Sequence, residues 1–190
     1  MNDKELITFD FGTGPVPAHQ HKNPDGSLGG WVANTATVAD TAYIGEDARV
    51  SGNARVFGNA EVYDKAWVYE NAQVFDNAQV YGTAWVSGNA WVYDKAWVFD
   101  NARVDDNASV YGNAEVYDNA RVFDNAKVFG NAKVYDNTYV YDKAWVYDKA
   151  YVFGNAWVFD NAKVSGNAWV YDNARVFDDA KVSGNAKVSG

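Results

Sequence analysis

Residues 114–131 read AEVYDNARVFDNAKVFGN, which is one six-residue pattern written three times: Ala, a variable residue, Val, an aromatic residue, Asp or Gly, and Asn. The pattern continues in both directions without an insertion or a deletion. Val stands at every sixth position from Val32 to Val188, with Ile44 as the one substitute, so (188 − 32)/6 + 1 gives 27 units. From Ala36 onward, Ala stands two positions before each of these residues, except at Thr138. This period organises almost the whole chain.

The spacing of Ala and Val predicts that both side chains share one face of a short β-strand, because successive strand side chains point to opposite sides. The positions beside Val hold Trp, Arg, Lys, Glu, Gln, Tyr, Phe or Ser, a variety that is typical of exposed sites. The Gly or Asp and the Asn that follow tolerate left-handed backbone and tight corners. Each unit is therefore predicted to be one strand and one corner, with Ala and Val inside.

A unit of this size cannot bury its own apolar face, so it has to coil and stack on its neighbours. The run from Val32 to Val188 resembles the hexapeptide-repeat left-handed parallel β-helix family (the trimeric acyltransferase-like superfamily), in which an aliphatic residue and a small residue two positions earlier line a triangular core. The resemblance implies an all-β solenoid with three strands in each 18-residue coil, and hence nine coils from 27 units. At about 4.8 Å between strands, the prism would be about 40 Å long.

Residues 1–31 lie outside the repeat, and we expect an N-terminal capping segment (residues 1–31) followed by the β-solenoid (residues 32–190). Glu5–Phe11 reads as a strand, whereas Pro15–Pro17 and Asn23–Gly26 read as turns. The sequence shows no matching cap after the last coil, so we expect unpaired backbone groups at that edge. The candidate interface there consists of Val176, Val182 and Val188.

Residues 18 apart should stack directly, and the position after Val then forms three columns of aromatic residues. The first contains Tyr63, Tyr81, Phe99, Tyr117, Tyr135, Phe153 and Tyr171; the second contains Phe57, Phe75, Tyr93, Tyr111, Phe129 and Tyr147; the third contains Tyr69, Phe123, Tyr141, Phe159 and Phe177, with Ser87 and Asp105 interrupting it. Stacking between coils contributes about 0.2–1 kcal/mol per cross-strand pair, which explains the ladders by structure alone. An alternative stays open, since such rows also form an apolar patch large enough for a partner chain or a polysaccharide.

The eight Trp all stand immediately before a Val, and we expect none of them inside the solenoid. Trp67, Trp85 and Trp157 are candidate interaction residues. They share a column with arginines, where a guanidinium over an indole would contribute about 0.5–1 kcal/mol per exposed contact. These arginines are Arg49, Arg103, Arg121 and Arg175.

One corner column is acidic at five consecutive levels, namely Asp106, Asp124, Asp142, Asp160 and Asp178. A row of carboxylates suggests a Ca²⁺ site, because Ca²⁺ takes several oxygen ligands. Asp is also a good corner residue that water and salt screen, and this interpretation needs no metal.

The composition limits the chemistry of the chain, which has no Cys, two His and a formal net charge of −9. Disulfides and sulfur-bound zinc are excluded, and the acidic balance argues against nucleic acid as a partner. No apolar run is long enough to span a membrane, and the start lacks the layout of a signal peptide, so we expect no membrane partner. The default compartment is the cytoplasm, with a phage particle or non-classical export left open.

Many members of the resembled family are acyl-CoA-dependent acyltransferases that take a catalytic His from the coils and build the site with an extruded loop. Here the coils have neither, and the two histidines, His19 and His21, lie in the cap segment, where they read as surface-loop residues or, alternatively, as a metal-binding pair on one strand face. We therefore expect no catalytic residue and no cofactor.

The expected function is a non-catalytic structural or interaction solenoid that self-associates through its last coil, its aromatic ladders or both, with a dimer of two C-terminal ends as the simplest assembly. Two alternatives stay open: an acyltransferase, and a carbohydrate-binding module with an aromatic platform. Uninterrupted repeats of this kind also resemble fibre-like proteins of bacteria and phages.

Overall fold

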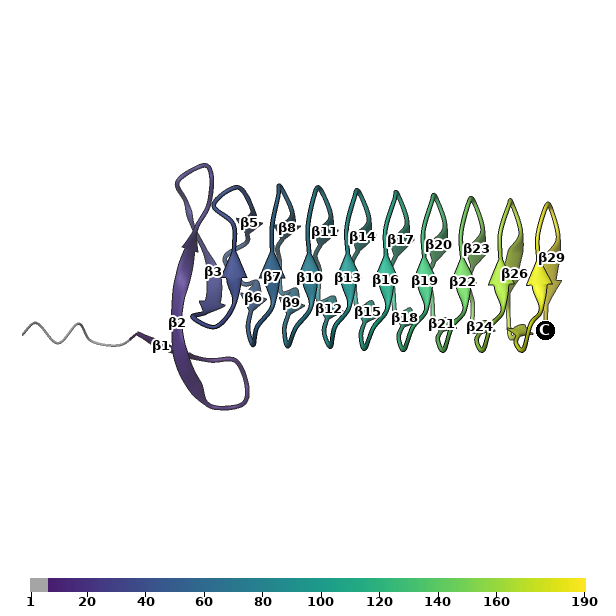
Figure 1. The fold of residues 1–190 in the computed structure, drawn as a ribbon, viewed down its shortest axis with the longest axis horizontal. Helices are drawn as coiled ribbons and strands as arrows, with labels where there is room; N and C mark the ends of the chain where they lie inside the picture. The colour runs from purple at the N-terminus through teal and green to yellow at the C-terminus, as the bar shows by residue number, and fades with distance from the viewer. Residues whose placement is uncertain (1–6) are drawn as a thin grey trace, which may run out of the picture.

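The chain forms a solenoid of stacked coils in a computed structural model that describes residues 7–190. Within that range the secondary structure is all β, and each coil adds one strand to each of three sheets (Figure 1). From β3 onward, paired strands are parallel and 18 residues apart, so that Gln73 lies between Arg55 and Trp91. The predicted β-solenoid of three strands per coil and about nine coils is confirmed.

The three sheets run side by side along the solenoid axis. The first consists of β1 (Thr8–Asp10), β2 (Pro15–Lys22), β3 (Leu28–Ala33), β6 (Arg49–Val50), β9 (Trp67–Val68), β12 (Trp85–Val86), β15 (Arg103–Val104), β18 (Arg121–Val122), β21 (Tyr139–Val140), β24 (Trp157–Val158) and β27 (Arg175–Val176). The second consists of β4 (Thr37–Val38), β7 (Arg55–Val56), β10 (Gln73–Val74), β13 (Trp91–Val92), β16 (Ser109–Val110), β19 (Lys127–Val128), β22 (Trp145–Val146), β25 (Lys163–Val164) and β28 (Lys181–Val182). The third consists of β5 (Tyr43–Ile44), β8 (Glu61–Val62), β11 (Gln79–Val80), β14 (Trp97–Val98), β17 (Glu115–Val116), β20 (Lys133–Val134), β23 (Tyr151–Val152), β26 (Trp169–Tyr171) and β29 (Lys187–Ser189).

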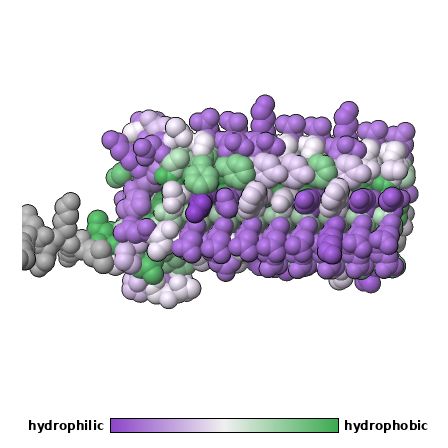
Figure 2. Space-filling view, viewed as in Figure 1, coloured by the Kyte–Doolittle hydropathy of each residue, from purple (hydrophilic) through white to green (hydrophobic). Residues whose placement is uncertain are grey.

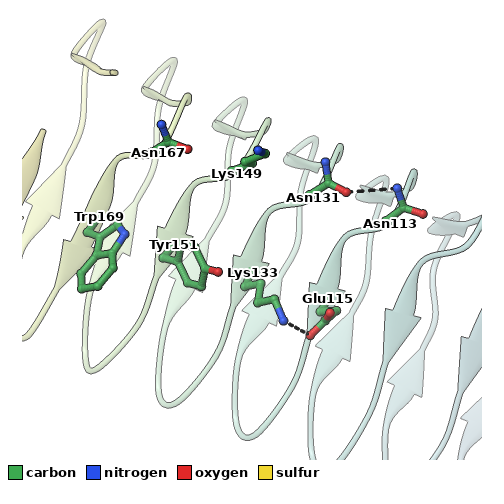
Figure 3. Close-up of a pocket in the computed structure, with 8 residues that line it drawn as sticks. All are labelled: Asn113, Glu115, Asn131, Lys133, Lys149, Tyr151, Asn167 and Trp169. Atoms are coloured by element: carbon green, nitrogen blue, oxygen red, sulfur yellow. Dashed lines mark hydrogen bonds and ion pairs between the residues drawn. The ribbon is translucent and has the colours of Figure 1, made fainter. Parts of the chain in front are cut away.

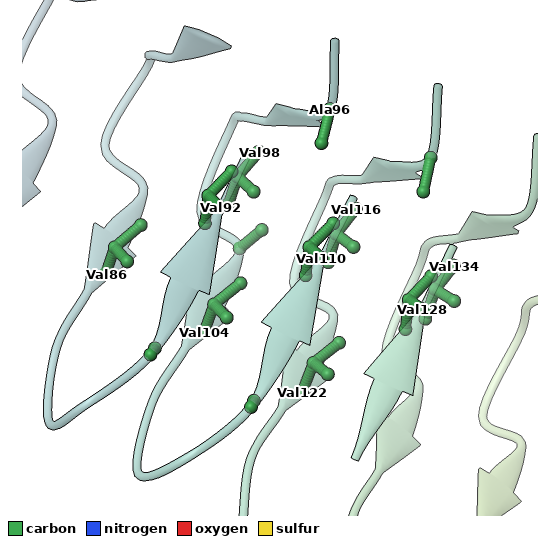
Figure 4. Packing of buried hydrophobic residues seen from close by; sticks show 14 of the residues in the cluster. Val86, Val92, Ala96, Val98, Val104, Val110, Val116, Val122, Val128 and Val134 are labelled. Carbon is green, nitrogen blue, oxygen red and sulfur yellow. The ribbon is translucent and has the colours of Figure 1, made fainter. Parts of the chain in front are cut away.

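Ala and Val fill the inside of the solenoid, as the two-residue spacing predicts. From Ala42 to Val170, each Ala, Val or Ile of the pattern is 0–1% exposed. Valines of successive coils lie one behind another along the axis (Figure 4). Thr138 takes an Ala position and is fully buried, and its hydroxyl oxygen has no hydrogen-bond partner within residues 7–190. The core thus repeats the same Ala and Val side chains in each coil, and Thr138 is the polar residue in this series.

The corners depend on residues in the left-handed region. From Gly52 to Gly184, the residue two positions after Val, which is Asp or Gly except at Glu70, has a positive φ, for example 56° at Asp142 and 64° at Gly88. Gly and Asp adopt this conformation more readily than most residues, which accounts for their alternation at this position. The coils are then joined by backbone hydrogen bonds, such as the one from the Trp97 N–H to the Ala114 carbonyl at 2.9 Å.

The N-terminal segment folds over the first coil. β2 pairs antiparallel with β1 and with β3, and β3 continues into the solenoid beside β6. β3 contains both Trp31 and Val32 and so crosses the expected boundary between cap and repeat. Gly29 and Gly30 are needed for this contact, because a Cβ at either position would lie 2.1 Å from a carbonyl oxygen of the first coil.

Two local predictions for this segment fare differently. The turn at Asn23–Gly26 is confirmed by a hydrogen bond of 2.8 Å from the Gly26 N–H to the Asn23 carbonyl. The prediction of a turn at Pro15–Pro17 is wrong, because these residues begin strand β2. Pro lacks a donor but keeps its acceptor, and the Pro17 carbonyl accepts the Asn34 N–H at 2.9 Å. The strand predicted over Glu5–Phe11 is β1 within the described residues, and Glu5 and Leu6 lie outside them.

Two buried side chains of the cap form the hydrogen bonds that a preceding coil would form with the third sheet. His21 Nε2 lies 3.0 Å from the Ala42 carbonyl oxygen, and the Asn23 side chain bonds both the carbonyl (3.0 Å) and the N–H (2.8 Å) of Ile44. One coil later, the equivalent carbonyls of Ala60 and Val62 accept backbone N–H groups. The cap therefore satisfies the backbone edge of the third sheet.

This arrangement corrects the prediction for the two histidines. They lie on strand β2 and not in a surface loop, and a bulge between Gln20 and Lys22 breaks the alternation. As a result His21 is buried, whereas His19 is exposed and its ring Nδ1 lies 2.9 Å from Asn34 Oδ1. The two rings therefore do not share one strand face.

Candidate functional site

Two aromatic ladders stack without interruption over much of the solenoid. In the Tyr63 ladder, which follows the third sheet to Tyr171, successive ring centroids are 4.8–5.3 Å apart and the planes lie within 11° of parallel. In the Phe57 ladder, which follows the second sheet to Tyr147, the stack begins at Phe75, and no stacked pair among residues 7–190 includes Phe57. Figure 2 shows a row of hydrophobic and pale residues along the axis between hydrophilic rows.

The stacking decides which part of each ring is available. Each inner ring has its two faces against the rings of the coils before and after it, so mainly the ring edges face solvent. The rings are half-buried, and burial raises the pKa of Tyr63 to about 12, with the charges of Tyr81, Glu61 and Asp64 adding to the effect. The ladders hold the coils together, and their ring faces are largely occupied within the chain.

The third column, which we call the Tyr69 column, is interrupted as predicted. Stacking resumes from Phe123 to Phe177, with centroids 5.0–5.4 Å apart. Asp105 lies in the gap, where burial and then the charge of Asp106 raise the pKa of its carboxyl above the usual range. An aromatic ring is the better fit for that half-buried position, since a carboxylate loses hydration there.

A hollow of about 560 Å³ lies where the Tyr69 column meets the cap, between Phe11, Val16 and Pro17 on one side and Trp67 and Tyr69 on the other. It exists because the column holds the small residues Ala33 and Ser51 at these levels. The Trp67 indole leans toward this space, donates a hydrogen bond to Ser51 Oγ at 3.0 Å, and lies 4.6 Å from the Tyr69 ring. Trp67 thus takes part of the room that a ladder ring would fill.

None of the eight Trp is buried, but their ring faces differ. Arg103 lies 4.3 Å from the Trp85 ring and Arg175 lies 4.8 Å from the Trp157 ring, as the shared column predicts. Lysines cover two more, with Lys163 over Trp145 and Lys187 over Trp169 at 4.4 and 4.5 Å. Arg49 lies over Phe9 of the cap instead.

Trp97 differs from all of these. It is 41% exposed, and among residues 7–190 no ring and no cationic group stacks on it. Trp91 is similarly exposed at 45%, but its ring forms T-shaped contacts with the rings of Phe75 and Tyr93. Trp97 therefore presents an indole face on which no other ring or cationic group of residues 7–190 stacks.

Trp97 lies in a groove that runs along the third sheet, and we call it the third-sheet groove. Two hollows of about 420 and 440 Å³ share Asn113 and Glu115 and so form one track. One side is the strand row of Gln79, Trp97, Glu115, Lys133, Tyr151 and Trp169, and the other is the corner row of Asn77, Lys95, Asn113, Asn131, Lys149 and Asn167. Figure 3 shows both rows at the end nearest Trp169.

The polar groups of this groove are well ordered. Lys133 forms an ion pair with Glu115 at 2.8 Å, and the Asn113 amide donates to Asn131 Oδ1 at 3.1 Å (Figure 3). The rings of Tyr151 and Trp169 lie 5.8 Å apart and are tilted by 52°, which leaves a wall of aromatic surface at one end. The groove combines fixed amides with exposed aromatic surface over six coils.

The acidic corner column forms a chain of hydrogen bonds. Oδ2 of Asp106, Asp124, Asp142 and Asp160 each accepts the N–H of the next Asp in the column at 3.1–3.4 Å. A Ca²⁺ ion would compete with these bonds for the same oxygens. Among residues 7–190 there is no group of three or more His, Cys, Asp or Glu side chains arranged to hold a metal ion.

The three valines predicted at the last coil differ in exposure. Val176 is 4% exposed and so is buried, whereas Val182 and Val188 are partly exposed. Val182 and Val188 pack against the core cluster that includes Val176. Within residues 7–190 no helix is long and apolar enough to cross a membrane.

Sequence reasoning missed the third-sheet groove and the hollow at the cap. The signal for the groove was present in the sequence, because Gln79, Trp97 and Glu115 are 18 residues apart. The polar corner residues Asn77, Lys95 and Asn113 stand two positions before them. The hollow depends on the path of the cap, which no repeat predicts.

A family model described as the YdcK Beta solenoid repeat matches residues 48–64, about one coil of the nine. This match agrees with the observed architecture and supports a β-solenoid repeat protein. No curated protein and no solved structure matches the chain. The resemblance to hexapeptide acyltransferases stays unconfirmed.

Proposed function

We propose that the chain is a non-catalytic interaction scaffold that self-associates through the edge formed by β27, β28 and β29. The observation that carries this proposal is the Phe177 ring, which stacks on Phe159 at 5.4 Å and is 47% exposed. Tyr141 and Phe159 have a ring on each face, but among residues 7–190 Phe177 has a ring on one face alone. A second copy of the chain would supply the missing ring.

The surroundings of Phe177 support the same interface. Ala180 and Ala186 are exposed, whereas the equivalent Ala residues of earlier coils are buried, and Val182 and Val188 are partly exposed beside them. Apolar surface at the end of three sheets favours association, because its burial removes it from water. At the other end the cap already bonds the Ala42 and Ile44 carbonyls, which opposes head-to-tail stacking and favours a two-fold dimer.

The positions of the histidines support a non-catalytic role. His21 is used to hold the first coil, His19 contacts Asn34 at the surface, and no coil contains His or Cys. An acyltransferase would need to bind an acyl-CoA, so titration calorimetry with acetyl-CoA at millimolar concentration tests this part. Saturable binding would overturn the non-catalytic assignment.

Self-association is tested by light scattering over a dilution series. The 190-residue chain is expected to be a dimer, and Phe177→Ser is expected to be a monomer at the same concentrations. Ser occupies this column at Ser51 and Ser87, so the fold tolerates it. Phe123→Ser, which removes a ring of the same column far from the edge, should stay dimeric. A monomeric parent chain, or a dimer that survives Phe177→Ser, would reject the proposal.

A further inference from the structure

The third-sheet groove has a chemistry of its own that self-association does not use. We infer that it binds a linear, neutral oligosaccharide laid along the solenoid axis, with one sugar ring against the free face of Trp97. This inference does not depend on the proposed dimer, because the groove lies on the side of β11–β26 and the dimer edge lies at Phe177.

The availability of ring faces selects this groove over the aromatic ladders. A sugar ring stacks on the face of an aromatic side chain, and the inner ladder rings have their faces against each other. Cations cover the rings of Trp85 and Trp157. Trp97 is 41% exposed and lines the groove together with Gln79 and Asn113. The indole and the amides therefore meet the same ligand.

The polar lining matches hydroxyl groups better than it matches charges. Asn and Gln amides both donate and accept, as sugar hydroxyls do, and four Asn and one Gln line the track. The central ion pair between Lys133 and Glu115 is internally satisfied. Lys95 and Lys149 each follow an Asp in the chain, namely Asp94 and Asp148. Positive and negative charges therefore balance along this rim of the groove. A neutral, polyhydroxylated ligand fits this surface.

Other extended polymers fit less well. A peptide that adds to a sheet needs a free strand edge, but the groove lies on a sheet face where the backbone is already paired, as in the bonds from Gln79 to Ala96 and from Trp97 to Ala114. A nucleic acid needs a basic surface, and this chain has a net charge of −9. An open groove with repeated amides suits a chain molecule that repeats along the axis.

The inference is tested by titration calorimetry with two neutral hexasaccharides, cellohexaose and maltohexaose, because the groove spans six coils and the two probes differ in the shape of the chain. At least one probe is expected to bind the full-length protein, and Trp97→Ser is expected to weaken that binding at least tenfold. Ser109 shows that the position before Val accepts Ser. Trp91→Ser is the matched control, since Trp91 is equally exposed on the second sheet.

Retained binding in Trp91→Ser together with its loss in Trp97→Ser would support the groove. Three results would overturn the inference: binding of neither hexasaccharide at millimolar concentration, equal weakening by both substitutions, and unchanged binding in Trp97→Ser. Circular dichroism of each variant shows that its solenoid is intact. A parent chain that dimerises but binds no sugar would reject this inference and leave the proposed scaffold standing.

Discussion

Replacing Thr138 by Ala is expected to stabilise the solenoid. Thr138 is fully buried, and its hydroxyl has no hydrogen-bond partner in the described part of the chain. Burying an unpaired hydroxyl costs about 1–3 kcal/mol. The substitution also removes a buried methyl group, which is worth about 0.8 kcal/mol. The hydroxyl outweighs the methyl, so the net gain in the free energy of unfolding should be about 0.2–2 kcal/mol.

Two further substitutions separate these contributions. Thr138→Val keeps the volume and removes the hydroxyl, so it should gain about 1–3 kcal/mol. Thr138→Ser keeps the hydroxyl and removes the methyl, so it should lose about 0.8 kcal/mol. Urea unfolding followed by circular dichroism gives the order of midpoints, and each kcal/mol corresponds to about 2–4 °C in melting temperature for a chain of this size. A Val variant no more stable than the parent would refute the reasoning, because the hydroxyl would then carry no cost.

Three other predictions follow from positions outside the core. Asp105→Tyr fills the gap below Phe123 and should raise the urea midpoint at pH 7, by about 0.5–1.5 kcal/mol for a new aromatic pair; a lower midpoint would argue against the ladder as a source of stability. Tyr63 has its pKa raised to about 12 from an ordinary value near 10, so its stabilising effect is complete below pH 10 and is lost toward pH 12. The melting temperature of Tyr63→Phe should therefore fall less between pH 8 and pH 11.5 than that of the parent protein. An equal fall in both proteins would contradict this prediction. Asn23→Ala removes the side-chain partner of the Ile44 N–H and carbonyl, which should lower the free energy of unfolding by about 1–3 kcal/mol. Amide hydrogen exchange should become faster in the first coil but not at Val140. Unchanged exchange at Ile44 would mean that Asn23 does not stabilise this edge.

The repeat determined most of the fold because two independent spacings agree. The two-residue spacing of Ala and Val sets which face is buried, and the six-residue period sets where each strand begins. Together they predict the burial of Val92 and Val146 and the stacking of Tyr81 on Tyr63. Each level repeats the one before it, so one correct unit gives all of them.

The cap was predicted less well because nothing in it repeats. Pro17 reads as a turn residue in isolation, yet its carbonyl serves the strand. His21 is buried because a bulge shifts β2, and a bulge has no signature in a stretch of eight residues. The sequence also did not predict the side-chain directions. The same position of the repeat holds Trp67, which donates a hydrogen bond to Ser51, and Trp97, on which no ring of residues 7–190 stacks.

The position before Val is where this chain departs most from its own repeat, and this determines where a function is to be sought. Strand pairing there is equally good with Glu115, Lys133 or Ser109, so the fold does not require an aromatic side chain at that position. An indole covered by a guanidinium, such as Trp85 under Arg103, still has a structural explanation. Within the described residues Trp97 has none of these contacts, and an exposed indole face beside ordered amides is a feature that stability alone does not explain. The differences between coils, rather than the coil itself, therefore define the surface that we propose for binding.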